Sequence, residues 1–106
     1  MTWKVVYLRE AEKDFDRLDG NQKIAVLKAM AKVAENPLPA NEGGYGKPLG
    51  NQRGNNLSGL LKVKLKRLGI RIVYKLLRVD DRLLVIVIGA RADNEVYDMA
   101  ARRMGK

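Results

Sequence analysis

The segment Leu60–Tyr97 constrains the fold of this chain most, because its hydrophobic pattern predicts three successive strands and then a helix. In Leu60–Leu65, apolar residues alternate with lysines, as in a strand that turns one face to a core. Ile70–Leu77 predicts the next strand. Leu83–Ile88 is apolar without alternation, which is typical of a central strand covered on both faces. The sequence Asp93-Asn94-Glu95 then predicts the start of a last helix.

The first third of the chain predicts one strand and two helices. Trp3–Leu8 contains β-branched and aromatic residues without a breaker, so we expect a strand there. From Arg9 onward, apolar residues recur at helical spacing until Asp19-Gly20-Asn21, which we expect to stop the first helix. A second helix is expected from Gln22 to about Glu35. Asn36-Pro37 ends it, because the residue before proline avoids the helical region.

These elements predict an α+β fold class, with the order β-α-α-β-β-β-α along the chain. In this fold a small, mostly antiparallel sheet carries a helical hairpin on one face and a C-terminal helix. With 106 residues, the chain is expected to form a single domain, residues 1–106. The stretch Pro37–Gly59 is rich in Gly, Pro and Asn and predicts a long loop, either ordered by a partner or directly functional.

The strand pattern also predicts which residues lie opposite one another. A loop of two or four residues centred on Arg67-Leu68 pairs Lys64 with Arg71 and Lys62 with Val73, on one side of the sheet. A three-residue loop would reverse the side unless a bulge restored it.

The position of Arg91 follows less directly from the pattern. A two-residue loop at Asp80-Asp81 would place Arg71 opposite Ala90, next to Arg91. The side of the sheet to which Arg91 points depends on the twist and the end of the preceding strand, and residue parity does not settle it.

The charge of the chain points to a polyanionic partner. Lys and Arg number 21 against 12 Asp and Glu, a net charge of +9, which favours nucleic acid or an acidic protein. The chain has neither Cys nor His, so disulfides and mechanisms that need imidazole or thiolate are excluded, and we expect no metal and no cofactor. The N-terminus lacks a signal-peptide core, and no apolar run could span a membrane, so a cytoplasmic protein is expected.

The predicted basic cluster suits the chemistry of a phosphodiester. Cations crowded on one sheet surface repel one another, and a phosphate relieves that repulsion. Crowding also favours the neutral form of a lysine, and either Lys62 or Lys64 could then take the proton from a ribose 2′-hydroxyl. Arg71 would stabilise charge on the phosphoryl oxygens, and Arg91 or a lysine could assist the leaving oxygen. Tyr97 could stack on a base or orient the phosphate.

The same residues also have simpler interpretations. Lys62, Lys64 and Lys66 match the solvated face of a strand, Arg91 could cap a strand end, and Tyr97 could pack in a core. Lys66 and Arg67, at the adjoining turn, are further candidates for binding RNA. Patterning alone therefore predicts a protein that binds an anion, with RNA among the candidates.

The region Leu57–Ala101 resembles the RelE/ParE superfamily of toxins from bacterial and archaeal toxin–antitoxin pairs. The resemblance rests on Leu57-Ser58-Gly59-Leu60-Leu61-Lys62-Val63-Lys64-Leu65, on Gly69-Ile70-Arg71-Ile72-Val73-Tyr74, and on Gly89-Ala90-Arg91 with Glu95-Val96-Tyr97. The K-x-K strand, the arginine after the last strand and the E-V-Y helix together resemble the RelE branch.

This resemblance implies a toxin that cleaves mRNA in the decoding site of the ribosome and is restrained by a cognate antitoxin. It implies a set of five catalytic residues: Lys62, Lys64, Arg71, Arg91 and Tyr97. The chain departs from the family in its longer Pro37–Gly59 stretch, in Leu60, where relatives often have an aromatic residue, and in Ala90, where a basic residue is frequent. These departures bear on substrate positioning and codon preference.

Two other functions remain open at this point. One is a ParE-like inhibitor of DNA gyrase with the same fold and no nuclease activity. Such members generally lack the full lysine–arginine–tyrosine set, so the five matching positions favour the nuclease. The other is a non-catalytic module that binds RNA or a protein partner, including a decayed toxin, against which the intact set argues.

Overall fold

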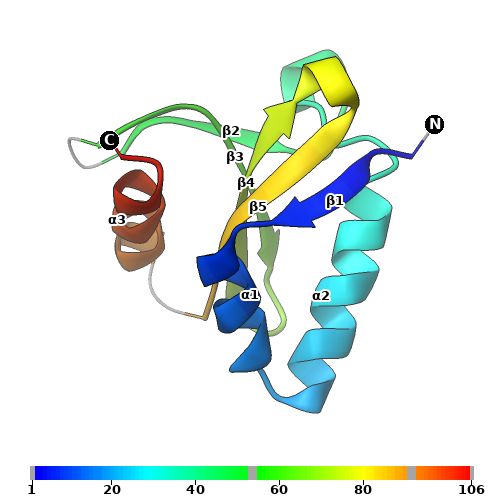
Figure 1. Ribbon diagram of the computed structural model, residues 1–106, viewed down its shortest axis with the longest axis vertical. Coiled ribbons are helices and arrows are strands. Elements are labelled where there is room, and N and C mark those ends of the chain that lie inside the picture. The colour runs from blue at the N-terminus through cyan, green and yellow to red at the C-terminus, as the bar shows by residue number, and fades with distance from the viewer. Residues whose placement is uncertain (1, 53–54, 91–92, 106) are drawn as a thin grey trace.

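The computed structural model describes residues 2–52, 55–90 and 93–105 (Figure 1). Its elements follow the chain in the order β1 (Lys4–Tyr7), α1 (Arg9–Asp16), α2 (Gly20–Val33), η1 (Ala40–Glu42), β2 (Lys47–Gln52), β3 (Asn55–Leu65), β4 (Ile70–Leu77), η2 (Arg78–Asp80), β5 (Arg82–Gly89) and α3 (Asp93–Arg103). The strands form one sheet in the order β1-β5-β4-β3-β2. Strand β1 runs parallel to β5, and the other neighbours are antiparallel. The predicted α+β class is confirmed.

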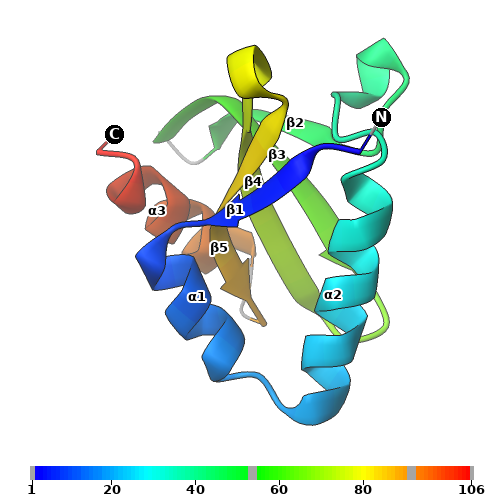
Figure 2. The same cartoon turned by 45° about the vertical axis from the view of Figure 1, so that its right-hand side comes forward.

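The two faces of the sheet carry separate hydrophobic cores. Helices α1 and α2 pack on one face, and α3 packs on the other (Figures 1 and 2). Alternation along the strands sorts the side chains, so that Leu61 and Ile72 face the helical hairpin while Leu60 and Val73 face α3. Strand β5 lies between β1 and β4, and most of it is buried, as the unbroken apolar run predicted.

The prediction of a loop over Pro37–Gly59 is wrong for most of its length. This stretch holds η1, strand β2 and the first residues of β3, so the chain has one more strand than the predicted order. Its Gly, Pro and Asn residues hid the pattern, although Leu49 and Leu57 are buried there and pack in the core beneath α3. Gly50, with φ +61°, follows a shift in the β2–β3 register, where glycine accepts the left-handed backbone of a strand irregularity.

The register between β3 and β4 is confirmed. A four-residue turn joins Leu65 to Ile70, and Lys64 lies opposite Arg71 as Lys62 does opposite Val73. Gly69, with φ +67°, takes a conformation in this turn that other residues rarely adopt.

The register between β4 and β5 was predicted wrongly. Arg71 lies opposite Gly89 instead of Ala90. The turn contains η2 and Asp81 in a left-handed conformation, so Leu77 pairs with Arg82. Ile86 is then an extra residue on β5, because its neighbours pair with consecutive residues of β4.

The start of the second helix was also placed too late. Asp19 caps α2, which begins at Gly20 and not at Gln22. The Gln22 N–H donates to the Asp19 carboxylate at 2.8 Å, and the Asp19 N–H donates to the Gln22 side chain at 3.0 Å. This reciprocal pair is a capping box, which supplies partners to two otherwise unpaired N–H groups.

A buried ion pair anchors the C-terminal end of α3. Arg103 Nη1 donates to Asp14 Oδ2 on α1 at 2.7 Å and to the Ile86 carbonyl at 2.8 Å. The same Asp14 oxygen accepts the Ile88 N–H at 3.1 Å. The contacts join α1, β5 and α3, and so fix the helix that carries Tyr97. Among the described residues, no helix is long and apolar enough to cross a membrane.

Candidate functional site

Three of the predicted site residues share the α3 face of the sheet. Lys62 and Lys64 lie on β3, and Arg71 lies opposite Lys64 on β4. Leu60 and Val73, which have the same strand parity, pack against α3. Helix α3 thus covers one end of this face, and the cations continue it toward the β3–β4 turn.

Tyr97 joins the cluster from α3. Lys62 Nζ donates a hydrogen bond to Tyr97 Oη at 2.8 Å, and it lies 5.5 Å from the centre of the Tyr97 ring. The ring is only 4% exposed and belongs to the core beneath α3. Tyr97 therefore packs in the core, as one of the two sequence interpretations held, and its hydroxyl contacts a predicted site residue. Its contact with RNA stays a prediction.

The β3–β4 turn positions the arginine of the cluster. Arg71 is half-buried, and its Nη1 donates to the Gly69 carbonyl at 2.9 Å. Lys64 is exposed, as are Lys66 and Arg67 in the turn itself. The predicted site residues that the described chain brings to this end of the sheet are Lys62, Lys64, Lys66, Arg67 and Arg71.

Arg91 lies outside the described residues, so its role stays a prediction. The described chain before it ends at Ala90, directly after Gly89, which lies opposite Arg71. The described chain resumes at Asp93, the first residue of α3.

A hollow of about 270 Å³ adjoins the cluster at the edge of β3. It lies between the second half of α2, the segment around Tyr45 and the end of β3. The lining residues are Ala29, Lys32, Val33, Tyr45, Lys47, Lys62, Val63, Lys64, Leu65 and Lys66. No sequence pattern pointed to Lys32 and Tyr45, because only tertiary folding brings α2 and Tyr45 beside β3.

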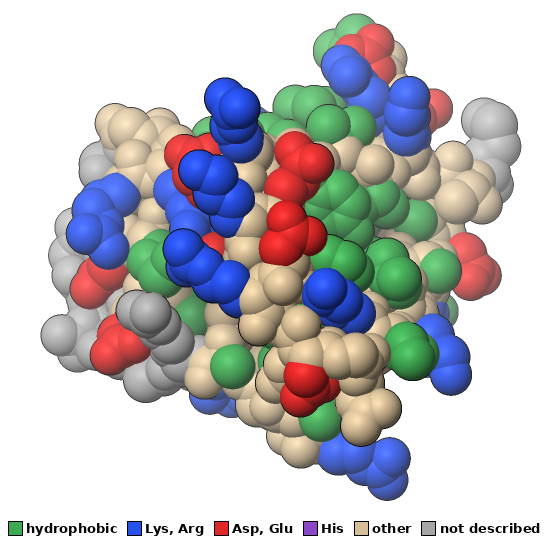
Figure 3. Space-filling view, turned by 60° about the horizontal axis from the view of Figure 1, so that its bottom comes forward, with side chains coloured by type: hydrophobic (Ala, Val, Ile, Leu, Met, Phe, Trp, Pro, Cys, Tyr) green, Lys and Arg blue, Asp and Glu red, His purple; other side chains and the backbone are tan. Residues whose placement is uncertain are grey.

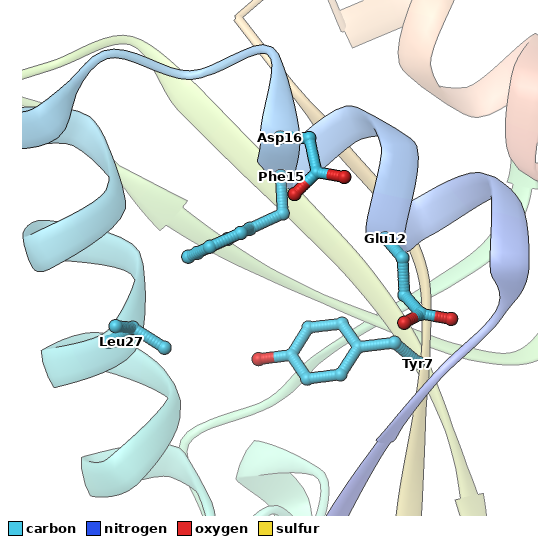
Figure 4. Close-up of a pocket in the computed structure, with 5 residues that line it drawn as sticks. All are labelled: Tyr7, Glu12, Phe15, Asp16 and Leu27. Carbon is cyan, nitrogen blue, oxygen red and sulfur yellow. The ribbon is translucent and has the colours of Figure 1, made fainter.

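A second hollow, of about 220 Å³, differs sharply in character. Tyr7, Phe15 and Leu27 come together between β1, α1 and α2, with Glu12 and Asp16 beside them on α1 (Figure 4). Burial raises the pKa of the Tyr7 hydroxyl above its usual value. On this side of the molecule, hydrophobic side chains form a patch with acidic groups alongside (Figure 3). Its carboxylates repel phosphate, so it is not a second site for the same ligand.

Across residues 2–52, 55–90 and 93–105, no cluster of acidic side chains is suited to bind a metal ion. The groups gathered on the α3 face are instead amines, a guanidinium and a phenol, which bind and polarise anions.

Comparison with known proteins gives a consistent result. No family model matches the chain. The chain is 28% identical over 106 residues to a RelE-like toxin protein of Escherichia coli, covering 98% of this chain and 99% of the relative. A double mutant of the E. coli toxin RelE in its free state matches with a TM-score of 0.73 at 26% identity, over 98% of this chain and 99% of the other. The RelBE2 toxin–antitoxin complex of Mycobacterium tuberculosis shares the fold, with a TM-score of 0.69 at 20% identity, over 86% and 100% of the two chains.

The five-stranded mixed sheet, with a helical hairpin on one face and α3 on the other, is thus the fold of the RelE toxins. The similarity in sequence and in structure extends along nearly the whole of both chains. In sequence and in fold the chain thus resembles the RelE-like branch of the RelE/ParE superfamily, as its motifs predicted.

Proposed function

We propose that this chain is a RelE-like toxin of a toxin–antitoxin system, an endoribonuclease that cuts mRNA in the decoding site of the ribosome and so stops translation in the cytoplasm. The observation that carries the proposal is the meeting of cations and a tyrosine on the α3 face. Lys62 Nζ lies 2.8 Å from Tyr97 Oη, and Lys64 lies directly opposite Arg71. Such a set binds a phosphodiester on several sides at once.

The proposed reaction is an intramolecular transfer within the RNA. An amine, that of Lys62 or Lys64, takes the proton from a ribose 2′-hydroxyl, and the 2′-oxygen attacks the adjacent phosphorus. The bond from phosphorus to the 5′-oxygen breaks, and this oxygen takes a proton from the ammonium group of the other lysine, which leaves a 2′,3′-cyclic phosphate on one product and a 5′-hydroxyl on the other. The nucleophile comes from the substrate, so the step balances without a metal or a redox partner.

The remaining residues have separate roles in this scheme. Arg71 stabilises the negative charge that develops on the phosphoryl oxygens, where a fixed guanidinium is most effective. Arg91 assists the departing 5′-oxygen. The Tyr97 hydroxyl orients Lys62 through their hydrogen bond. Lys66 and Arg67 extend the basic surface for the flanking RNA backbone.

The proposed partners are ribosome-bound mRNA and a cognate antitoxin. A net charge of +9 favours association with the polyanionic ribosome. The antitoxin proposal is supported by fold relatives that were solved as toxin–antitoxin complexes, the M. tuberculosis RelBE2 complex and the E. coli RelBE complex.

Programmed ribosomes test this function. Purified toxin is added to ribosomes that hold a defined mRNA with an empty decoding site, and the new 5′ ends are mapped. We expect a cut within the decoding-site codon and no cut in the same mRNA without ribosomes. Unchanged mRNA would contradict the proposal, and inhibition of DNA gyrase by the same preparation would instead support the ParE-like alternative.

A further inference from the structure

The hollow beside β3 lies where the sheet edge is left open. Strand β2 pairs with β3 only as far as Lys47 opposite Lys62, so β2 does not cover the last residues of β3, Val63–Leu65. Helix α2 and the segment around Tyr45 flank this edge, and the hollow between them measures about 270 Å³. Because Lys62 lines the hollow and also contacts Tyr97, the hollow is continuous with the proposed catalytic cluster.

The charge around this hollow has one sign. Lysines contribute from three separate segments: Lys32 from α2, Lys47 from β2, and Lys62, Lys64 and Lys66 from the end of β3 and the turn after it. No acidic residue is among the described side chains that line it. Like charges brought together in this way destabilise the surface unless an anion sits between them. The backbone of a single-stranded nucleic acid carries successive phosphates, which can lie against several of these lysines at once.

Tyr45 adds a group that the charge alone does not explain. Its side chain is 49% exposed, and Lys32 Nζ lies 5.4 Å from the centre of its ring. An exposed aromatic ring beside cations is the arrangement on which single-stranded nucleic acids stack their bases. An acidic peptide would use the lysines but has no use for the open ring face.

The position of Tyr45 is fixed by its backbone. The Tyr45 N–H donates to the Asn36 carbonyl at 3.1 Å, and the Asn36 side chain donates to the Gly43 carbonyl at 3.1 Å. The next residue, Gly46, packs against the Tyr74 hydroxyl, which itself donates to the Pro37 carbonyl at 2.7 Å. The ring therefore stands on a backbone that is held in place before any ligand arrives.

We propose that this hollow is a second RNA subsite, which holds a nucleotide next to the bond that is cut. Its base stacks on Tyr45, and its backbone phosphates lie against Lys32, Lys47 and Lys66. Lys62 forms the border between this subsite and the catalytic cluster. The proposal rests on the proposed function in one respect, that single-stranded RNA is the ligand of the adjoining cluster.

The test measures binding without cleavage. A short, fluorescent 2′-O-methyl RNA is titrated with the toxin at several salt concentrations, and its anisotropy gives the affinity. We expect Lys32→Ala to weaken binding and to reduce the slope of log affinity against log salt by about 0.7, the contribution of one phosphate contact in a single strand. The matched control is Lys28→Ala, which removes the same charge from an exposed position on the same helix that does not line the hollow, and it should leave the slope unchanged.

The tyrosine gives a second readout. Tyr45→Ala should weaken binding roughly 5-fold to 100-fold, the range of one base–aromatic stack, without changing the salt slope, and Tyr45→Phe should bind like the wild type. Equal slopes for Lys32→Ala and Lys28→Ala, or unchanged affinity in Tyr45→Ala, would overturn the subsite. So would a poly-glutamate peptide that binds the hollow while the RNA does not.

The two proposals can fail separately. If the mRNA on programmed ribosomes is not cut, but Lys32→Ala and Tyr45→Ala weaken oligonucleotide binding as expected, the hollow is an RNA-binding site and the nuclease function is contradicted. If ribosomal cleavage is normal but Lys32→Ala and Tyr45→Ala bind the oligonucleotide like the wild type, the nuclease stands and the subsite falls.

Discussion

The two faces of the sheet are built from the same strands and differ in what covers them. On the hairpin face, Leu61, Val63 and Leu65 of β3 pack with α1 and α2. On the α3 face, Leu60 is covered, but Lys62 and Lys64 extend past the core beneath the helix. Alternation along a strand thus assigns its side chains to the two faces, whereas the extent of the covering helix decides which side chains on a face stay accessible to a ligand.

Breaking the Asp14–Arg103 ion pair, which anchors α3, should cause the largest loss of stability. Asp14→Ala leaves the Arg103 guanidinium buried without its carboxylate, and it removes an acceptor from the Ile88 N–H. We expect the free energy of unfolding in urea to fall by about 3–5 kcal/mol, as for other broken buried ion pairs. The control is Glu42→Ala, which breaks an exposed pair with Arg78 and should cost less than about 1 kcal/mol. Equal losses in the two variants would contradict an anchoring role.

Removing the cation opposite Lys64 should abolish most of the activity and leave the fold intact. Arg71→Ala is expected to lower cleavage on the ribosome by about 10²- to 10³-fold, the effect of losing one group that stabilises developing charge. Lys64→Ala should also lose cleavage. Lys75→Ala is the matched control, because Lys75 lies at the other end of β4 on the same face, opposite Leu60. Loss of folding in both Arg71→Ala and Lys64→Ala would point to a structural role instead.

A substitution on the hairpin face should lower the free energy of unfolding. Tyr74 is fully buried, and its hydroxyl donates to the Pro37 carbonyl, so Tyr74→Phe should cost about 1–3 kcal/mol at neutral pH. Burial raises the pKa of Tyr74 well above its usual value. The folded state therefore favours the neutral phenol, and this contribution is complete below about pH 10, the unfolded value, and is lost as the pH rises toward the folded one. Denaturation between pH 9 and 11 should show a shallower loss of stability in Tyr74→Phe, and an identical slope would contradict this.

Removing the Tyr97 hydroxyl should have a smaller effect on stability and on cleavage. Tyr97→Phe keeps the packing under α3 and removes the hydroxyl that accepts from Lys62. We expect its stability to change by about 1 kcal/mol or less, with cleavage reduced roughly tenfold, consistent with one hydrogen bond. Unfolding in urea and cleavage on the ribosome measure the two roles separately. Wild-type cleavage in this variant would leave Tyr97 as a core residue alone.

Much of the α3 face could be predicted from the sequence, because its signals are local. The alternation of β3 and the length of the β3–β4 turn are enough to place Lys64 opposite Arg71. The β4–β5 register could not be obtained this way. It depends on the left-handed Asp81 in a longer turn and on the extra residue Ile86, and neither has a distinct pattern.

The parts that the sequence did not reveal depend on contacts between distant segments. Strand β2 is held by pairing with β3 and by Leu49 beneath α3, in a stretch whose composition is that of a loop. The contact between Lys62 and Tyr97 joins residues from β3 and α3, and the sequence pattern did not predict it. Tyr45 and Lys32 meet through folding alone.

In the proposed reaction, a ribose 2′-hydroxyl is the nucleophile at the cluster of Lys62, Lys64, Arg71 and Tyr97. The most direct measurement uses programmed ribosomes with two mRNAs that differ only in one atom, a 2′-deoxy substitution in the nucleotide on the 5′ side of the mapped cut. We predict that the unmodified mRNA yields a 2′,3′-cyclic phosphate and that the 2′-deoxy mRNA is not cut at that position. Cleavage of the 2′-deoxy mRNA at the same bond would contradict the account.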